Sequence, residues 1–173
     1  VRHTTAGDLT LPPGEVLHVD FGVKVEGYAA DLQRLYYRPS DAHPDPPAAL
    51  VDAHGDVRAA IDAAFDALEP GAVGHAVDAA ARETLVDRGW PEYAHATGHG
   101  VGRFAHDGGT LLGPQWDRYG DAPGGVVREG EVYTLELGVE TEWGYLGQED
   151  LAVVTDDGAA WFHPPQTELR RVE

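Results

Sequence analysis

Two acidic residues, Asp20 and Asp31, lie in a segment rich in Val, Leu and Tyr that predicts a β-hairpin over residues 15–37. A two-residue turn at 25–26 would place the two carboxylates directly opposite each other. A turn at 26–27 would leave them one diagonal step apart on the same face. Carboxylates held this close inside apolar strands repel each other unless they share a proton or a cation.

A second acidic pair, Glu136 and Glu149, repeats this arrangement. A hairpin over residues 131–155 that turns at 142–143 would place these two side chains directly opposite each other, again among apolar neighbours. Each acid taken alone could instead be an exposed strand residue of an acidic protein. Two symmetric acidic hairpins favour a site, and carboxylates with imidazole suit Mn, Co, Zn or Fe.

Three histidines, His95, His99 and His106, lie within a glycine-rich segment that predicts irregular or strand-like backbone. His95 and His99 have the spacing of a zinc-binding HExxH helix, but the Glu is missing and Thr97-Gly98 would break the helix. The glycines would let backbone approach a ligand closely. We expect the remaining histidines outside the first few residues to be surface or packing residues: His18, His43, His54, His75 and His163.

Few side chains could act as a nucleophile in this chain. Cysteine is absent, and the single serine, Ser40, lies in a proline-rich connection. A metal-activated water is therefore the remaining hydrolytic nucleophile.

Two helices should connect the hairpins and support them. Apolar residues recur at helical spacing over 48–68, with Asp and Arg on the opposite face, and again over 74–87. The expected inward residues are Leu50, Val51, Val57, Ile61, Phe65 and Leu68 in the first helix, and Val77, Ala80, Ala81, Leu85 and Val86 in the second. The order hairpin, two helices, hairpin predicts an α+β domain with helices on one face of a mostly antiparallel sheet.

Composition excludes several partners. The 173 residues carry 30 Asp plus Glu against 12 Lys plus Arg, a formal net charge of −18, so nucleic acid and anionic membrane surfaces would repel the chain. No apolar run approaches the ~20 residues of a membrane span. These features predict one domain over residues 1–173, with the cytoplasm as the default location. Methionine is absent, including at position 1, which indicates a chain that does not begin where translation begins.

Four segments, HVDFGVKVEGYAAD, HATGHGVGRFAHD, VYTLELG and QEDLAVVT, occur in this order. Together they resemble the metal-site segments of the pita-bread metallopeptidases, the creatinase/aminopeptidase fold that includes prolidase, aminopeptidase P and methionine aminopeptidase. The resemblance covers residues 3–155. It implies a curved, mostly antiparallel sheet with helices on its outer face, lacking the family's usual N-terminal part.

The resemblance also implies roles for single residues. Two divalent ions, Mn first among Mn, Co, Zn and Fe, would be held by Asp20, Asp31, His99, Glu136 and Glu149. Asp31 and Glu149 would bridge the ions, and a hydroxide between them would attack the scissile carbonyl. Glu136 would also move the proton, and the upstream histidine His3, with His95 and His106, would complete the catalytic set.

The implied activity is hydrolysis of the bond before proline in short Xaa-Pro peptides. Alternatives are a non-catalytic peptide- or protein-binding module on the same fold and a hydrolase like methionine aminopeptidase or creatinase. Two positions depart from the family pattern: Leu137 stands where the family often has proline, and Gly147 where the prolidase branch commonly has arginine. A homodimer, or completion by an N-terminal segment, is the expected assembly.

Overall fold

The computed structural model describes residues 7–8 and 10–172. Its main sheet has the strand order β1-β4-β6-β5, and neighbouring strands along this path are antiparallel. Two short strands extend it, since β7 pairs with β6 and β8 runs parallel to β4. The bounds are β1 Val16–Phe21, β4 Leu32–Tyr37, β5 Val132–Thr141, β6 Gly144–Thr155, β7 Gly158–Trp161 and β8 Arg170–Arg171.

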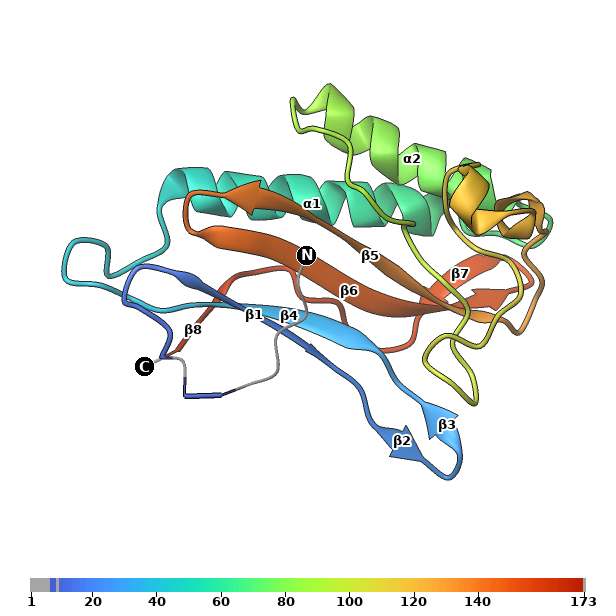
Figure 1. Cartoon of the computed structure of the whole chain (residues 1–173), viewed down its shortest axis with the longest axis horizontal. Coiled ribbons are helices and arrows are strands. Elements are labelled where there is room, and N and C mark those ends of the chain that lie inside the picture. The colour runs from blue at the N-terminus through green and yellow to red at the C-terminus, as the bar shows by residue number, and fades with distance from the viewer. Residues whose placement is uncertain (1–6, 9, 173) are drawn as a thin grey trace.

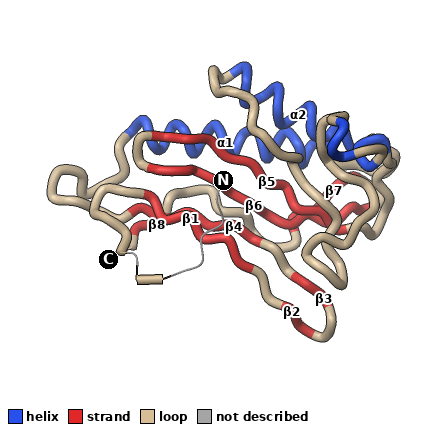
Figure 2. Tube along the Cα trace, in the orientation of Figure 1, coloured by secondary structure: helices blue, strands red, loops and turns tan. Residues whose placement is uncertain are grey.

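Both expected helices form, as α1 Ala48–Ala67 and α2 Gly74–Asp87. Helix α1 packs on β5 and β6, and α2 packs on α1, so the helices lie on one side of the sheet (Figure 1). The predicted α+β architecture is therefore confirmed. A long loop region joins α2 to β5 (Figure 2), interrupted by two single-turn 3₁₀ helices, Asp117–Tyr119 and Ala122–Gly124.

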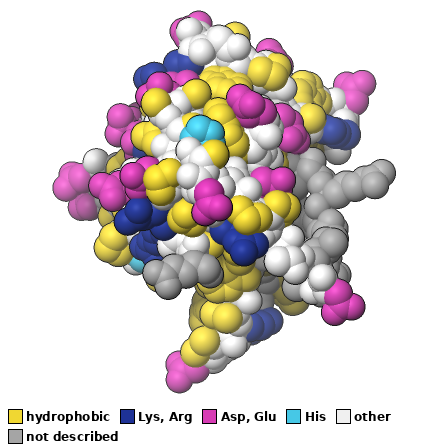
Figure 3. All heavy atoms as spheres, turned by 90° about the vertical axis from the view of Figure 1, so that its left-hand side faces the viewer, with side chains coloured by type: hydrophobic (Ala, Val, Ile, Leu, Met, Phe, Trp, Pro, Cys, Tyr) yellow, Lys and Arg dark blue, Asp and Glu magenta, His cyan; other side chains and the backbone are white. Residues whose placement is uncertain are grey.

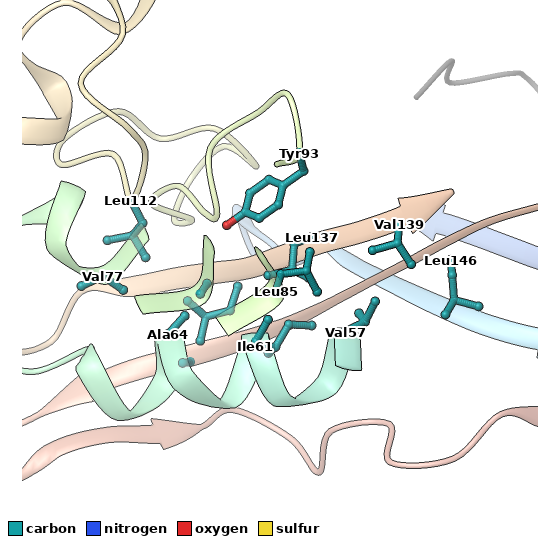
Figure 4. Packing of buried hydrophobic residues seen from close by; sticks show 14 of the residues in the cluster. Val57, Ile61, Ala64, Val77, Leu85, Tyr93, Leu112, Leu137, Val139 and Leu146 are labelled. Atoms are coloured by element: carbon teal, nitrogen blue, oxygen red, sulfur yellow. The ribbon is translucent and has the colours of Figure 1, made fainter. Parts of the chain in front are cut away.

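The core lies between α1 and the sheet. Val57 and Ile61 of α1 point toward Leu137 of β5 (Figure 4), and all three side chains are almost fully buried. The predicted inward faces need correction, because Val51 is 49% exposed and Val86 is 42% exposed. Charged residues take buried positions on these helices instead: Arg58 on α1, and Asp78 and Arg82 on α2.

The first hairpin ends in a small separate ribbon, β2 Lys24–Val25 paired with β3 Tyr28–Ala29, which projects from the sheet (Figure 1). Glu26 and Gly27 both have positive φ, 51° and 90°. Positive φ at both central residues is the geometry of the tight turns that suit the twist of a hairpin. The turn at 26–27 is therefore the correct one of the two alternatives.

Acidic side chains are spread over the face shown in Figure 3, with fewer Lys and Arg among them.

Within the described part of the chain, no helix combines the length and the apolar character needed to cross a bilayer.

Candidate metal centre

One cross-sheet row brings three acids and one amide together. Asp20 of β1 is paired with Gln33 of β4, Gln33 with Glu149 of β6, and Glu149 with Glu136 of β5. Directly paired residues of neighbouring strands project from the same face of a sheet. The row therefore places these four side chains side by side, and the predicted opposition of Glu136 and Glu149 is confirmed.

Asp31 joins the row from the position directly before β4. It lies two residues before Gln33, the partner of Asp20, so it is one diagonal step from Asp20. The two backbones lie in close contact beside it, since a Cβ on Gly22 would lie 2.1 Å from the Ala30 carbonyl oxygen. Only glycine permits this approach, which holds Asp31 beside the end of β1 and the start of β4.

His99 reaches the site because its segment runs along the outer edge of β5. The amides of Thr134 and Glu136 donate to the carbonyls of His99 and Thr97, at 3.0 and 2.7 Å. A Cβ on Gly98 would lie only 1.9 Å from the Thr134 carbonyl oxygen. Gly98 thus lets the segment pack closely against β5, and the His99 Nε2 lies 3.4 Å from Glu136 Oε1.

A buried ion pair on α2 holds the backbone that leads into this segment. Arg82 binds both carboxylate oxygens of Asp78, each at 2.9 Å, and donates to the carbonyls of Tyr93 and His95. Asp78 also accepts from the amide and hydroxyl of Thr97, at 3.2 and 2.7 Å. The pair therefore ties α2 to the part of the loop that carries His95 and His99.

A cavity of about 500 Å³ opens over the row. It is lined by all five expected ligands and by two of the expected catalytic histidines. These seven residues are Asp20, Asp31, His95, His99, His106, Glu136 and Glu149. The third expected histidine, His3, lies outside the described residues.

Ligand atoms in the cavity lie in overlapping groups within 4.8 Å of one another: Asp20, Asp31 and Glu149 form one group, and His99, Glu136 and Glu149 form another. Glu149 belongs to both, so its carboxylate lies between the two groups. A third group joins Asp31 and His99 to His106, whose ring centroid is 3.9 Å from that of His99.

The electrostatics of the acids reflect this crowding. Burial, followed by the charges of Glu136, Asp31 and Asp20, raises the pKa of Glu149 to about 10. Burial also raises the pKa of Asp31, with Asp20 and Glu136 adding to it. Burial acts in the same direction on Glu136, but the hydrogen bond and charge of His99 outweigh it and leave the pKa of Glu136 below its usual value. The partner His99 has a raised pKa, because Glu136 outweighs the effect of burial.

The donor set fits divalent cations. Glu149 is 1% exposed, and its Oε1 has no hydrogen-bond partner among the described residues. A buried carboxylate oxygen without a donor is costly, and a cation is the group that both satisfies it and offsets its acidic neighbours. Carboxylates with imidazole suit Mn, Fe, Co and Zn.

His18 and Gln33 are among the pocket residues that sequence reasoning missed. His18 was expected to be a surface or packing residue, but it lines the cavity, as does Gln33. Gln33 lies in β4 with 7% of its surface exposed. It pairs with Asp20 inside the first hairpin, and the pairing of β4 with β6 places it beside Glu149, in what we call the acidic row of Asp20, Gln33, Glu149 and Glu136. For His18 a signal existed, because it precedes Asp20 by two residues and so shares its face.

Two curated proteins resemble this chain in sequence over most of its length. An Xaa-Pro dipeptidase of Lactobacillus delbrueckii subsp. lactis is 30% identical over 164 residues, which cover 93% of this chain and 41% of that protein. A probable dipeptidase of Mycobacterium bovis is 33% identical over 161 residues, covering 91% of this chain and 39% of that protein. The chain thus spans about two fifths of the length of these curated relatives.

Among solved structures, the dipeptidase PepE of Mycobacterium ulcerans superposes with a TM-score of 0.82 at 31% identity, covering 96% of this chain and 42% of that one. The expected pita-bread fold is thereby confirmed. Residues 1–156 match metallopeptidase family M24, and the chain therefore belongs to that family.

Proposed function

We propose that the protein is a divalent-metal-dependent peptidase that hydrolyses the bond before proline in short Xaa-Pro peptides. The observation that carries the proposal is the pair of ligand groups that share Glu149 inside one cavity. Relatives named Xaa-Pro dipeptidase support the substrate class.

Two sets of residues would hold the ions. Asp20 would bind the first, His99 and Glu136 the second, and Asp31 and Glu149 would bridge them. Two divalent ions, Mn²⁺ first among the candidates, would supply Lewis-acid activation of the attacking water and of the scissile carbonyl.

Glu136 would handle the proton. His99 keeps the pKa of Glu136 low, so its carboxylate is ionised at neutral pH and can accept a proton from the attacking water. The same group would then return the proton to the leaving amine. His95 and His106 line the cavity beside the ligands and would contact the substrate, and His3 is assigned to the same set by family resemblance.

The test is hydrolysis of a panel of Xaa-Pro dipeptides by the full-length protein loaded with Mn²⁺. We expect turnover that His99→Ala abolishes. His75→Ala is the matched control, because His75 lies on α2 and does not line the cavity, and it should leave turnover unchanged. Metal-loaded protein that is inert towards every Xaa-Pro peptide would overturn the proposal, and failure to bind metal would favour the non-catalytic binding module.

A further inference from the structure

The one uncharged member of the acidic row, Gln33, makes the contacts of a positioning residue. Its amide nitrogen donates to Glu136 Oε2 at 3.1 Å, and its amide oxygen lies 2.8 Å from the Nε2 of His18. A carboxylate only accepts, so the nitrogen of the amide must face Glu136 and the oxygen must face a donor. His18 therefore donates from Nε2, and its bond fixes the orientation of the amide.

Two glycines make room for this arrangement. Gly138 and Gly147 are directly paired across β5 and β6. A Cβ on Gly147 would lie 3.1 Å from both Gln33 Oε1 and His18 Nε2, and 2.4 Å from Cε1 of Tyr145. Any side chain at position 147 would push on the amide, on the imidazole and on the tyrosine ring at once.

Tyr145 closes this end of the cavity. Its ring lies over both glycines, since a Cβ on Gly138 would come within 2.6 Å of its hydroxyl oxygen. The ring also contacts the imidazole of His18 edge to face, with centroids 5.3 Å apart. His18 is thus held on one side by an aromatic ring and on the other by the amide it orients.

The chemistry of the amide suits its place in the row. Gln33 lies between Asp20 and Glu149, where a further carboxylate would add repulsion. An amide separates the charges, fills the space with 7% of its surface exposed, and offers a donor to Glu136. His99 contacts Oε1 of that carboxylate while Gln33 contacts Oε2, so the two oxygens are held by different groups.

We propose that Gln33, oriented by His18 in the space above Gly147, is a positioning residue that fixes the Glu136 carboxylate for metal binding and proton transfer. This inference rests on the proposed function for the proton-transfer step. The role in metal binding can be measured without turnover.

The first experiment is a direct titration of the metal-free, full-length protein with Mn²⁺, without substrate. Gln33→Met keeps the length of the side chain but removes donor and acceptor, and Gln33→Glu keeps an acceptor for His18 but loses the donor to Glu136. Loss of a hydrogen bond that orients a ligand typically weakens metal binding about 10–100-fold. We expect weakening in this range for Gln33→Met. With saturating Mn²⁺, kcat for an Xaa-Pro dipeptide should fall more than KM rises.

Gln166→Met is the matched control for stability. Gln166 is also a buried glutamine, 3% exposed, but its amide bonds the backbone of Leu35 and Glu168, and it does not line the cavity. This variant should lower the Tm while leaving the affinity for Mn²⁺ unchanged. Equal loss of affinity in Gln33→Met and Gln166→Met would overturn the proposal, because it would indicate a general loss of structure.

A mutant cycle with Gly147→Ala tests the mechanism. If the added methyl group acts by displacing Gln33, Gly147→Ala alone should weaken Mn²⁺ binding, and adding it to Gln33→Met should weaken binding little further. Fully additive effects of the two substitutions would overturn the positioning role. So would an Mn²⁺ affinity of Gln33→Met within about twofold of wild type, because that is well short of the loss expected for an orienting hydrogen bond. Failure of the proposed function gives a different result, in which the wild type binds Mn²⁺ but hydrolyses no Xaa-Pro peptide.

Discussion

Glu149 and Asp150 are consecutive residues of β6, but their carboxylates lie on opposite faces of the sheet. Both are buried, at 1% and 0% exposure. Asp150 is paired with Arg34 at 3.0 Å and with Arg58 of α1 at 2.8 Å, whereas Glu149 lines the cavity. On this strand the Asp150 carboxylate faces the helices and is neutralised by two arginines. The Glu149 carboxylate faces the proposed metals and lies among other carboxylates.

Removing the charge of Asp150 should destabilise the protein strongly. Asp150→Asn removes the negative charge that Arg34 and Arg58 share, and breaking a buried ion pair in this way costs about 3–5 kcal/mol. Urea denaturation measures the free energy of unfolding. The control is Asp45→Asn, because Asp45 and Arg171 form an exposed pair, 76% and 60% exposed, for which a loss of about 0–1 kcal/mol is expected. Equal losses in the two variants would contradict the prediction.

In the metal-free protein, replacing Glu149 should give a stability advantage over wild type that grows as the pH rises. The pKa of Glu149 is about 10 in the folded state, against 4.5 for an unperturbed glutamate, so between these values the folded state binds more protons and its stability falls with rising pH. Glu149→Gln removes that loss, and its advantage in Tm should grow from about pH 5 to about pH 9 in EDTA. About 1 kcal/mol corresponds to a shift of about 2–4 °C in a protein of this size.

The control for this experiment is Asp52→Asn, which removes one negative charge from an exposed position of α1. Its Tm relative to wild type should change little over the same pH range. The prediction fails if Glu149→Gln is less stable than wild type at the alkaline end of that range.

Divalent metal should stabilise the folded protein. A ligand at about 100 times its Kd adds about 2.7 kcal/mol for each site that exists only in the folded state. Mn²⁺ should therefore raise the Tm, EDTA should reverse the rise, and Asp31→Asn should diminish it because Asp31 belongs to two of the ligand groups. Calorimetry with and without Mn²⁺ measures this, and an equal rise in Asp31→Asn would place the binding elsewhere.

Breaking the Asp78–Arg82 pair should loosen the loop that carries His95 and His99. Asp78→Asn weakens the hold on Arg82 and on Thr97. Amide hydrogen exchange should accelerate in residues 93–101, and the affinity for Mn²⁺ should fall. Arg88→Ala is the control, since Arg88 bonds Asp56 at the surface with 45% of its side chain exposed. Unchanged exchange in Asp78→Asn would show that the loop is held by other contacts.

Local sequence determined the two helices and the register of the second hairpin. Apolar spacing placed α1 and α2 because helix periodicity is a local property of the chain. The opposition of Glu136 and Glu149 followed from the position of one turn, since a turn and the two-residue pleat fix every pair in a hairpin. The first hairpin left two registers open, and the positive φ values of Glu26 and Gly27 decided between them.

Apart from the family resemblance, which named the five expected ligands, only the tertiary structure decided which residues of the two hairpins share one site. Gln33 joins the first hairpin to the second through its pairing with Glu149, 116 positions away, and no local pattern marks a contact at that separation. For the same reason Arg58 and Arg82 could not be told from surface charges, because a charged side chain is buried only where a partner neutralises it and neighbouring elements cover it. The sequence thus determined the two halves of the acidic row, and the packing of β4 against β6 joined them into one site.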